Sequence, residues 1–265
     1  MAFPIFKENV FSYVCISVGD AFGLAQSLNE ENNPYGFSKN CNTHMMKNSE
    51  WGAAAYLTQS NYGRNGTEIV INNYLTPKGD SRPTSMDVSF CAKTGYGAIS
   101  SKDANASDTD VALYNTEKGV LASTTGNIYG VYDMVGGSYE YVSAYAEGLN
   151  GAGYNAYKST EEYYNEYGSY LLKSTNGKMK SMLSINRDYS SQHTGRGQNE
   201  NFLTHSKIFG DAMWEVSQSG NSNYGNNWNS DYRAYPSDAS AFLGRGGYMS
   251  GGSTAGVFCF CNYAR

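Results

Sequence analysis

Cysteine and histidine are the side chains whose spacing would first suggest chemistry in this chain. Cys259 and Cys261 are separated by one residue, so a strand would place both thiols on the same face. A zinc site would also need histidine partners, and His44, His193 and His205 form no ligand-spaced pair. The sequence therefore predicts no metal site. Because the 5 cysteines are odd in number and irregularly spaced, it predicts no disulfide framework either.

The motifs of common catalytic sites are also missing from the sequence. We find no Ser-His-Asp set, no phosphate-binding loop and no paired carboxylates with the spacing of an acid-base site. We therefore expect no catalytic residues, no cofactor and no enzymatic activity.

Tyrosine is the most unusual feature of the composition. The chain has 24 Tyr against 11 Phe and 3 Trp, together with 30 Gly and many Ser and Asn. These residue types are typical of adaptable binding surfaces, because a tyrosine ring offers contact area at a low cost in rotamer entropy. Half-buried positions of a sheet would also use tyrosine, so the composition alone leaves both interpretations open.

Two segments have the pattern of a helix. Residues 17–28 place Ala21, Leu24, Ala25 and Leu28 on one face, with Ser17 as the expected N-cap. Residues 48–59 begin with Asn48 and Ser49 as candidate caps, followed by Glu50 in the first turn, and direct Trp51, Ala54 and Ala55 inward.

After residue 65 the chain consists of short Tyr-, Val-, Phe- and Thr-rich segments separated by Gly, Asn, Asp and Ser, which predicts short strands and much irregular loop. The fold class expected is α+β, in a single domain over 1–265 with an insertion at 150–189.

Charge and hydropathy exclude several partners. The net charge of −5 argues against binding to nucleic acid, whose protein partners carry basic faces. No apolar run is long enough to span a membrane, so we expect no membrane insertion by this chain. Lys7 and Glu8 interrupt the region where a signal peptide would need an apolar core. No secretion signal is therefore visible.

Four motifs occur in the same order as in a known family. They are ISVGDA from Ile16, MMKNSEWGAAA from Met45, NIYGVYDMVGGSYEYV from Asn127 and LGRGGY from Leu243. Together they resemble the formylglycine-generating enzyme (sulfatase-modifying factor) family, a variant of the C-type lectin fold, over most of the chain. The resemblance implies a C-type lectin-like fold with two short helices, short strands and much loop.

The chain departs from the enzymes of that family in two places. Their copper-binding cysteine pair follows the R-G-G signature closely, whereas here no cysteine occurs between Gly247 and Cys259. The family Asn beside a frequent calcium site is Gly137 here, and Glu140 alone would be a poor calcium cage. These departures argue against an oxidase and against a calcium site.

The closer resemblance is to the variable proteins of diversity-generating retroelements, whose C-terminal lectin-fold surface is rewritten by adenine-directed mutagenesis. Residue types that an adenine-substituted Asn codon encodes lie around a set of fixed residues, which are Arg245, Gly246, Gly247, Gly252, Ala255, Gly256, Phe258 and Phe260. The resemblance implies a variable region at about 225–265 and a non-enzymatic display protein on a cell surface or a phage virion. Its partner would be an unknown protein or glycan on a cell.

By this analogy, the ligand-binding residues are exposed and lie on both sides of the R-G-G motif. Tyrosine and arginine dominate many binding hot spots, so Tyr232, Tyr235, Tyr248, Tyr263 and Arg265 are expected to contribute most. The full predicted set is Asn229, Ser230, Tyr232, Arg233, Tyr235, Tyr248, Ser250, Thr254, Cys259, Cys261, Asn262, Tyr263 and Arg265. Two alternative functions stay open: a fixed calcium-dependent lectin-like sugar-binding domain, and an oxidase of the formylglycine-generating type.

Overall fold

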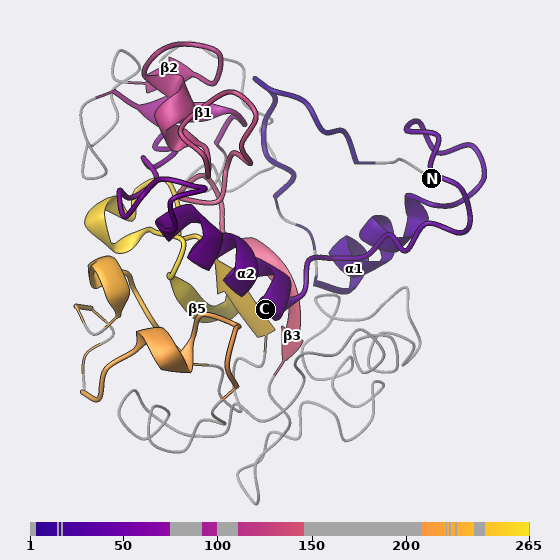
Figure 1. Ribbon diagram of the computed structural model, residues 1–265. Coiled ribbons are helices and arrows are strands. Elements are labelled where there is room, and N and C mark those ends of the chain that lie inside the picture. Colours follow the sequence, from indigo (N-terminus) through magenta and orange to yellow (C-terminus); the bar gives the residue numbers. More distant parts are fainter. Residues whose placement is uncertain are drawn as a thin grey trace, which may run out of the picture.

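The computed structural model describes residues 4–14, 16, 18–74, 92–99, 111–145, 208–220, 222, 224–225, 227–235 and 242–264 (Figure 1). This part of the chain combines two α-helices with two small antiparallel sheets, so the α+β class is confirmed. The expected insertion at 150–189 lies outside the described residues. None of the helices in this part is long and apolar enough to cross a membrane.

Both predicted helices are present. Helix α1 spans Val18–Ser27 and helix α2 spans Asn48–Gln59. The expected cap of α2 is corrected, because the residue before the helix is Lys47, whose backbone N–H donates to the Glu50 carboxylate at 2.8 Å. Asn48 is instead buried and its amide donates to Asp211 at 3.0 Å. The side chain that would have capped the helix therefore joins it to a distant segment.

The strands form two separate sheets. Strands β1 (Tyr96–Ala98) and β2 (Val111–Leu113) pair with each other. Strands β3 (Glu140–Tyr145), β4 (Phe242–Arg245) and β5 (Phe260–Ala264) form the second sheet in that order. Short 3₁₀ turns complete the fold at Gly119–Ala122 (η2), Trp214–Val216 (η4), Trp228–Ser230 (η5) and Gly252–Thr254 (η6).

Both outer strands of the larger sheet have further backbone partners. On the β3 side, the Ser143 N–H donates to the Met46 carbonyl at 2.8 Å. On the β5 side, the Phe260 N–H donates to Tyr232 at 3.0 Å and its carbonyl accepts from Ala234 at 2.8 Å. Paired edges protect a sheet against unwanted pairing with other chains.

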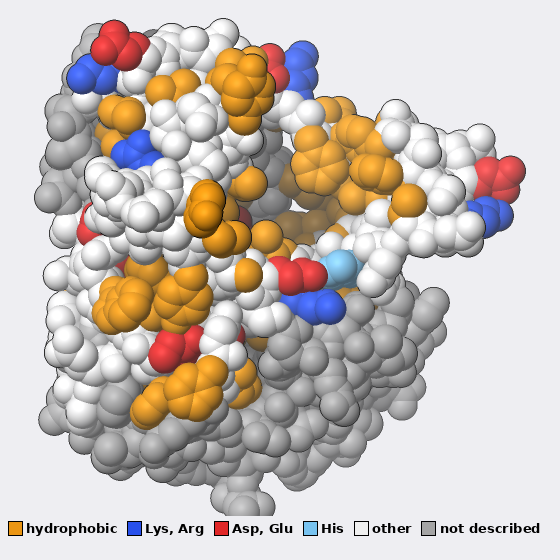
Figure 2. Space-filling model, viewed as in Figure 1, with side chains coloured by type: hydrophobic (Ala, Val, Ile, Leu, Met, Phe, Trp, Pro, Cys, Tyr) orange, Lys and Arg blue, Asp and Glu red, His pale blue; other side chains and the backbone are white. Residues whose placement is uncertain are grey.

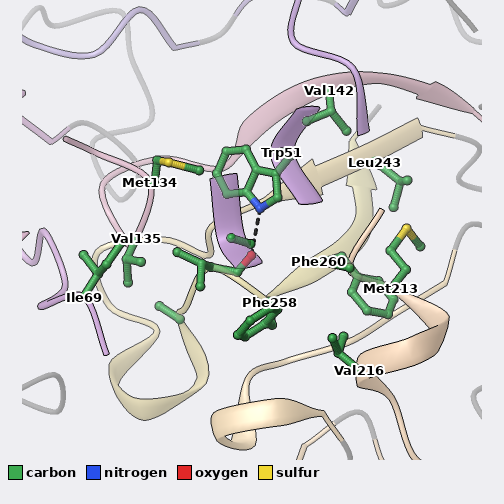
Figure 3. Close-up of a cluster of buried hydrophobic side chains, with 14 of the residues drawn as sticks. Trp51, Ile69, Met134, Val135, Val142, Met213, Val216, Leu243, Phe258 and Phe260 are labelled. Atoms are coloured by element: carbon green, nitrogen blue, oxygen red, sulfur yellow. Dashed lines mark hydrogen bonds between the residues drawn. The ribbon is translucent and has the colours of Figure 1, made fainter. Parts of the chain in front are cut away.

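The main core lies between α2 and the larger sheet (Figure 3). Its buried side chains come from α2, from residues 69–71 and 134–135, from all three strands and from the segments 212–216 and 255–260. At its centre, the Trp51 indole Nε1 donates to the Val257 carbonyl at 2.7 Å. The helix is therefore joined to the chain that leads into β5.

Arg245 of the R-G-G motif belongs to this core. Its side chain is fully buried, its guanidinium lies 5.7 Å from the ring centroids of both Trp51 and Phe260, and Nη2 donates to Ala212 at 3.2 Å. Burial lowers the pKa of Arg245 to about 10, which Asp211 partly offsets. The arginine remains charged at neutral pH and packs between aromatic faces.

The loop around Asp133 ties three segments together. Asp133 has a φ of +63° and accepts hydrogen bonds from the Gly95 N–H at 2.9 Å and the Asn72 amide at 2.7 Å. Gly136 has a φ of +76°, and its N–H donates to the Gly246 carbonyl at 3.1 Å. A side chain at Gly136 would collide with residues 71–72, so glycine is required there. The third motif of the sequence is thus a structural junction beside the R-G-G turn.

Candidate functional site

A groove of about 1220 Å³ is the candidate binding site. One wall is the N-terminal segment with α1, and the other is formed by the start of β3 with parts of the chain between Tyr224 and Cys261. Figure 2 shows hydrophobic side chains gathered around this hollow, between the part that carries α1 and the rest of the molecule. Its described lining residues are Pro4, Phe6, Ser12, Tyr13, Val14, Ile16, Ala21, Leu24, Ala25, Leu28, His44, Met45, Met46, Thr94, Ser138, Tyr139, Glu140, Tyr141, Tyr224, Tyr232, Gly244, Tyr248, Ser250, Gly251, Thr254 and Cys261.

Tyrosine rings form the wall on the sheet side. The rings of Tyr139 and Tyr248 lie 5.5 Å apart between centroids, and those of Tyr224 and Tyr232 lie 5.0 Å apart in an edge-on arrangement. Both separations are in the range of favourable aromatic pairs. Burial raises the pKa of Tyr139 far above that of an exposed tyrosine, so its phenol remains neutral. The wall therefore presents uncharged aromatic surface.

The opposite wall comes from the apolar face that the sequence predicts for α1. Ala21, Leu24, Ala25 and Leu28 all line the groove, and the first three are half-buried. Phe22, on the same helix, is fully buried. The apolar face of α1 thus borders the groove and is not packed entirely into the core. Part of its apolar surface therefore remains accessible to a ligand.

Charge is nearly absent from the described lining. It contains no Lys, Arg or Asp, and its one histidine, His44, contacts Glu50 at 3.0 Å. The Glu140 carboxyl is directed to the Gly246 turn, because a side chain at Gly246 would collide with its Oε2. Burial raises the pKa of Glu140 well above its usual value, and nearby Asp133 adds to the effect. Both effects favour the neutral form of Glu140 over the carboxylate.

Five predicted ligand-binding residues line the groove: Tyr232, Tyr248, Ser250, Thr254 and Cys261. Ser250 is exposed, and Tyr248 and Thr254 are half-buried. Tyr232 and Cys261 are almost fully buried, at 7% and 1% exposure, so the exposed position expected for them is wrong, and they support the groove from beneath its surface.

The expected surface position of three other residues is wrong. Tyr235 is part of the main core, Cys259 is fully buried and Arg233 is 1% exposed. The reason is that residues 232–235 lie alongside β5, with Arg233 bridged to Phe260, so side chains on both segments turn inward. The Arg233 Nη2 donates to the Gly220 carbonyl at 3.0 Å, which fixes the guanidinium inside the fold.

Asn229 and Ser230 are exposed as predicted, but they lie in η5 and do not line the groove. Both have a positive φ, of 58° and 62°. Asn262 and Tyr263 lie in β5, with side chains that are not described, and Arg265 lies outside the described residues.

On the sheet side of the groove, the tyrosines not predicted as site residues are Tyr139, Tyr141 and Tyr224, and Tyr13 on the N-terminal wall was not predicted either. The first two belong to the third sequence motif, and the tyrosine-rich composition was the signal that pointed to a binding surface. What the sequence did not indicate is that β3 and the 224–232 segment form one wall.

The described residues contain no group of three His, Cys, Asp or Glu side chains that could hold a metal ion. Among the described residues, the calcium alternative depends on Glu140, and Asp133 is the carboxylate that acts on its charge. Asp133 Oδ1 accepts from Asn72, and both of its carboxylate oxygens lie within hydrogen-bonding distance of the Gly95 N–H. The donor set present is therefore a poor fit to a hard cation, which needs six to eight oxygen ligands.

Comparison of the chain with protein-family models, with curated proteins and with solved structures finds no match. The assignment of a function therefore depends on the sequence motifs and on the geometry of the groove.

Proposed function

We propose that this protein is a non-enzymatic ligand-binding display protein with a C-type lectin fold of the formylglycine-generating-enzyme type. Its C-terminal surface is diversified by a retroelement, and it recognises a protein or glycan on a cell from a cell surface or phage virion. The groove is its combining site.

The observation that carries the proposal is the convergence of predicted variable positions on one groove. Tyr248, Ser250 and Thr254 follow the R-G-G motif and line the groove beside the tyrosines of β3. Its volume of about 1220 Å³ is above the roughly 300–1000 Å³ of most small-molecule sites. A macromolecular ligand suits this size, and exposed tyrosines suit an adaptable contact surface.

Burial restricts which positions tolerate diversification. Substitutions at Tyr235 or Cys259 would change the packed interior, where a difference of even one methylene group affects stability. Ser250 and Thr254 can vary without that cost because they are exposed or half-buried. The proposal therefore locates variation at the groove and at the exposed turn Asn229–Ser230.

Sequencing the codons for residues 225–265 across a natural population tests the proposal. We expect adenine-derived substitutions at Tyr248, Ser250, Thr254, Asn229 and Ser230, a near-identical invariant repeat in the flanking DNA, and little change at Tyr235. A uniform sequence in all individuals, with no such repeat, would overturn the retroelement proposal.

A binding measurement tests the combining site separately. Full-length protein with Tyr248→Ala should lose binding to the target cells that the parent protein recognises, while its thermal unfolding is nearly unchanged because Tyr248 is only half-buried. Tyr129→Ala is the matched control, since Tyr129 is 94% exposed and does not line the groove. Equal binding by the two variants would exclude the groove as the combining site.

A further inference from the structure

We propose that the groove recognises a basic segment of a partner protein, by placing a lysine or arginine side chain against the tyrosine wall. This inference rests on the proposed function, because it assigns a ligand class to the same groove.

The tyrosine wall provides the attraction. The faces of aromatic rings carry negative charge density, and a cation within about 6 Å of a ring centroid is attracted to them. The pairs Tyr139–Tyr248 and Tyr224–Tyr232 bring four rings to one wall of one groove. Tyr224 is 61% exposed, so part of this ring surface is accessible to a ligand.

The charge of the groove and of the chain selects among ligands. The described lining has no Lys or Arg, so an anionic ligand such as an acidic glycan finds no cation to pair with. The described lining has no Asn, Gln or Asp, so a neutral glycan would have to be held by hydroxyl groups of Ser, Thr and Tyr without the side-chain amides and Asp carboxylates that fix an orientation. The net charge of −5 favours approach by a positively charged partner.

The rim of the groove favours a protein segment over a free small cation. Phe6 and Tyr13 on the N-terminal wall are 70% and 68% exposed, and both line the groove opposite the tyrosine wall. Large aromatic side chains are enriched at protein interfaces, where the apolar stems of lysine and arginine also pack. A basic side chain between these walls gains apolar contact along its stem and attraction at its charged end.

Four capped tripeptides test the ligand class: acetyl-Gly-X-Gly-amide with X as arginine, lysine, norleucine or glutamate. The full-length protein carries ¹³C-labelled tyrosine rings, and each peptide is titrated while the ring resonances are recorded by NMR. We expect the arginine and lysine peptides to shift the groove rings with a Kd about two- to thirtyfold lower than the norleucine peptide. The glutamate peptide should bind most weakly.

Variants assign the site. Tyr224→Leu and Tyr248→Leu should raise the Kd of the arginine peptide. Tyr248→Phe should leave this Kd unchanged because the ring face remains. Tyr129→Leu should have no effect on it. Tyr224 is mostly exposed, so its variant remains informative if Tyr248→Leu fails to fold.

Three results would overturn the inference. Equal binding of the norleucine and arginine peptides would mean that the groove is apolar and has no preference for a cation. That result would still be compatible with the proposed function. Ring shifts from neutral oligosaccharides but not from the arginine peptide would point to a glycan ligand. No ring shift with any peptide also rejects the inference, and cell binding by the parent and Tyr248→Ala then decides the proposed function independently.

Discussion

The Trp51 indole and the Val257 carbonyl are joined by a 2.7 Å hydrogen bond between residues 206 positions apart. Trp51 is 3% exposed and Val257 is also 3% exposed, so the bond lies inside the core. A buried carbonyl left without its donor costs free energy that water does not repay.

We therefore expect Trp51→Phe to lower the free energy of unfolding by about 2 to 4 kcal/mol, since it removes both the hydrogen bond and packed ring volume. Denaturant unfolding followed by circular dichroism measures the change. Trp228→Phe serves as the control, because Trp228 is 46% exposed and should cost less than about 1 kcal/mol. A similar loss in both variants would mean that the buried bond contributes little.

Gly256 lies against the carboxylate of Asp231. A Cβ at this position would collide with both carboxylate oxygens, and Asp231 is fully buried, with Oδ2 accepting from the Phe258 N–H at 3.0 Å. Gly256→Ala should therefore destabilise the protein by about 2 to 4 kcal/mol through overpacking and loss of that bond.

Gly23→Ala is the matched control in thermal unfolding. A Cβ at Gly23 meets nothing within 4 Å, and the residue lies within α1. Alanine there should be neutral or stabilise by up to about 1 kcal/mol. If Gly256→Ala unfolds at the parent temperature, the contact with Asp231 is not tight in solution.

The raised pKa of Asp211 should make the stability of the protein depend on pH. Burial and the neighbouring Glu215 carboxylate raise its pKa to about 7. Between about pH 4 and pH 7, the Asp211 carboxyl is therefore protonated in the folded protein, whereas in the unfolded chain its pKa is ordinary and the proton has been released. Stability should fall as the pH rises through this window and level off above it. Between pH 5 and pH 7 the loss from this group is at most about 2 to 3 kcal/mol.

Asp211→Asn should flatten that profile. The Met213 N–H still finds an acceptor, and the Asn48 Oδ1 has no partner within the described structure, so a reversed Asn48 amide can accept from the new side chain. Urea unfolding at pH 5, 6, 7 and 8 measures the difference between the two proteins. An identical slope in both would assign the pH dependence to other carboxyls, with Glu140 the first candidate.

Cysteine reactivity gives a test of burial. Cys259 and Cys261 are at most 1% exposed, and burial raises the pKa of the Cys259 thiol well above its usual value, whereas Cys41 is half-buried. Alkylation depends on the thiolate and on access to it, so iodoacetamide should label Cys41 before Cys259 and Cys261. Peptide mapping by mass spectrometry reports each site. Labelling of Cys259 as rapid as that of Cys41 in native protein would contradict its location in the core.

The two helices could be predicted because their signals are local. Apolar residues at helical spacing define α1 and α2. The N-cap of α2 could not be predicted, since the Asn48 amide is used by Asp211, 163 residues away. Local rules do not register such distant partners.

The candidate site was only partly predictable for the same reason. Tyr248, Ser250 and Thr254 line the groove, but Tyr235 and Cys259 are buried because residues 232–235 lie alongside β5. Their residue types suggested that Tyr235 and Cys259 lie at the surface. Strand pairing, however, determines which side chains point into the core. The walls of the groove combine the N-terminal segment and α1 with β3 and with residues 224–261, a relationship between distant segments that the periodicity of the sequence does not reveal.

The separation of Trp51 from Val257 also determines when this protein acquires its structure during synthesis. At about 5 to 20 residues per second, a ribosome needs roughly 10 to 40 s to add the 206 residues between them. Strand β3 is added partway through that interval, whereas β4 and β5, which complete the core with α2, come only around its end. The complete core can therefore close only after β5 has left the exit tunnel.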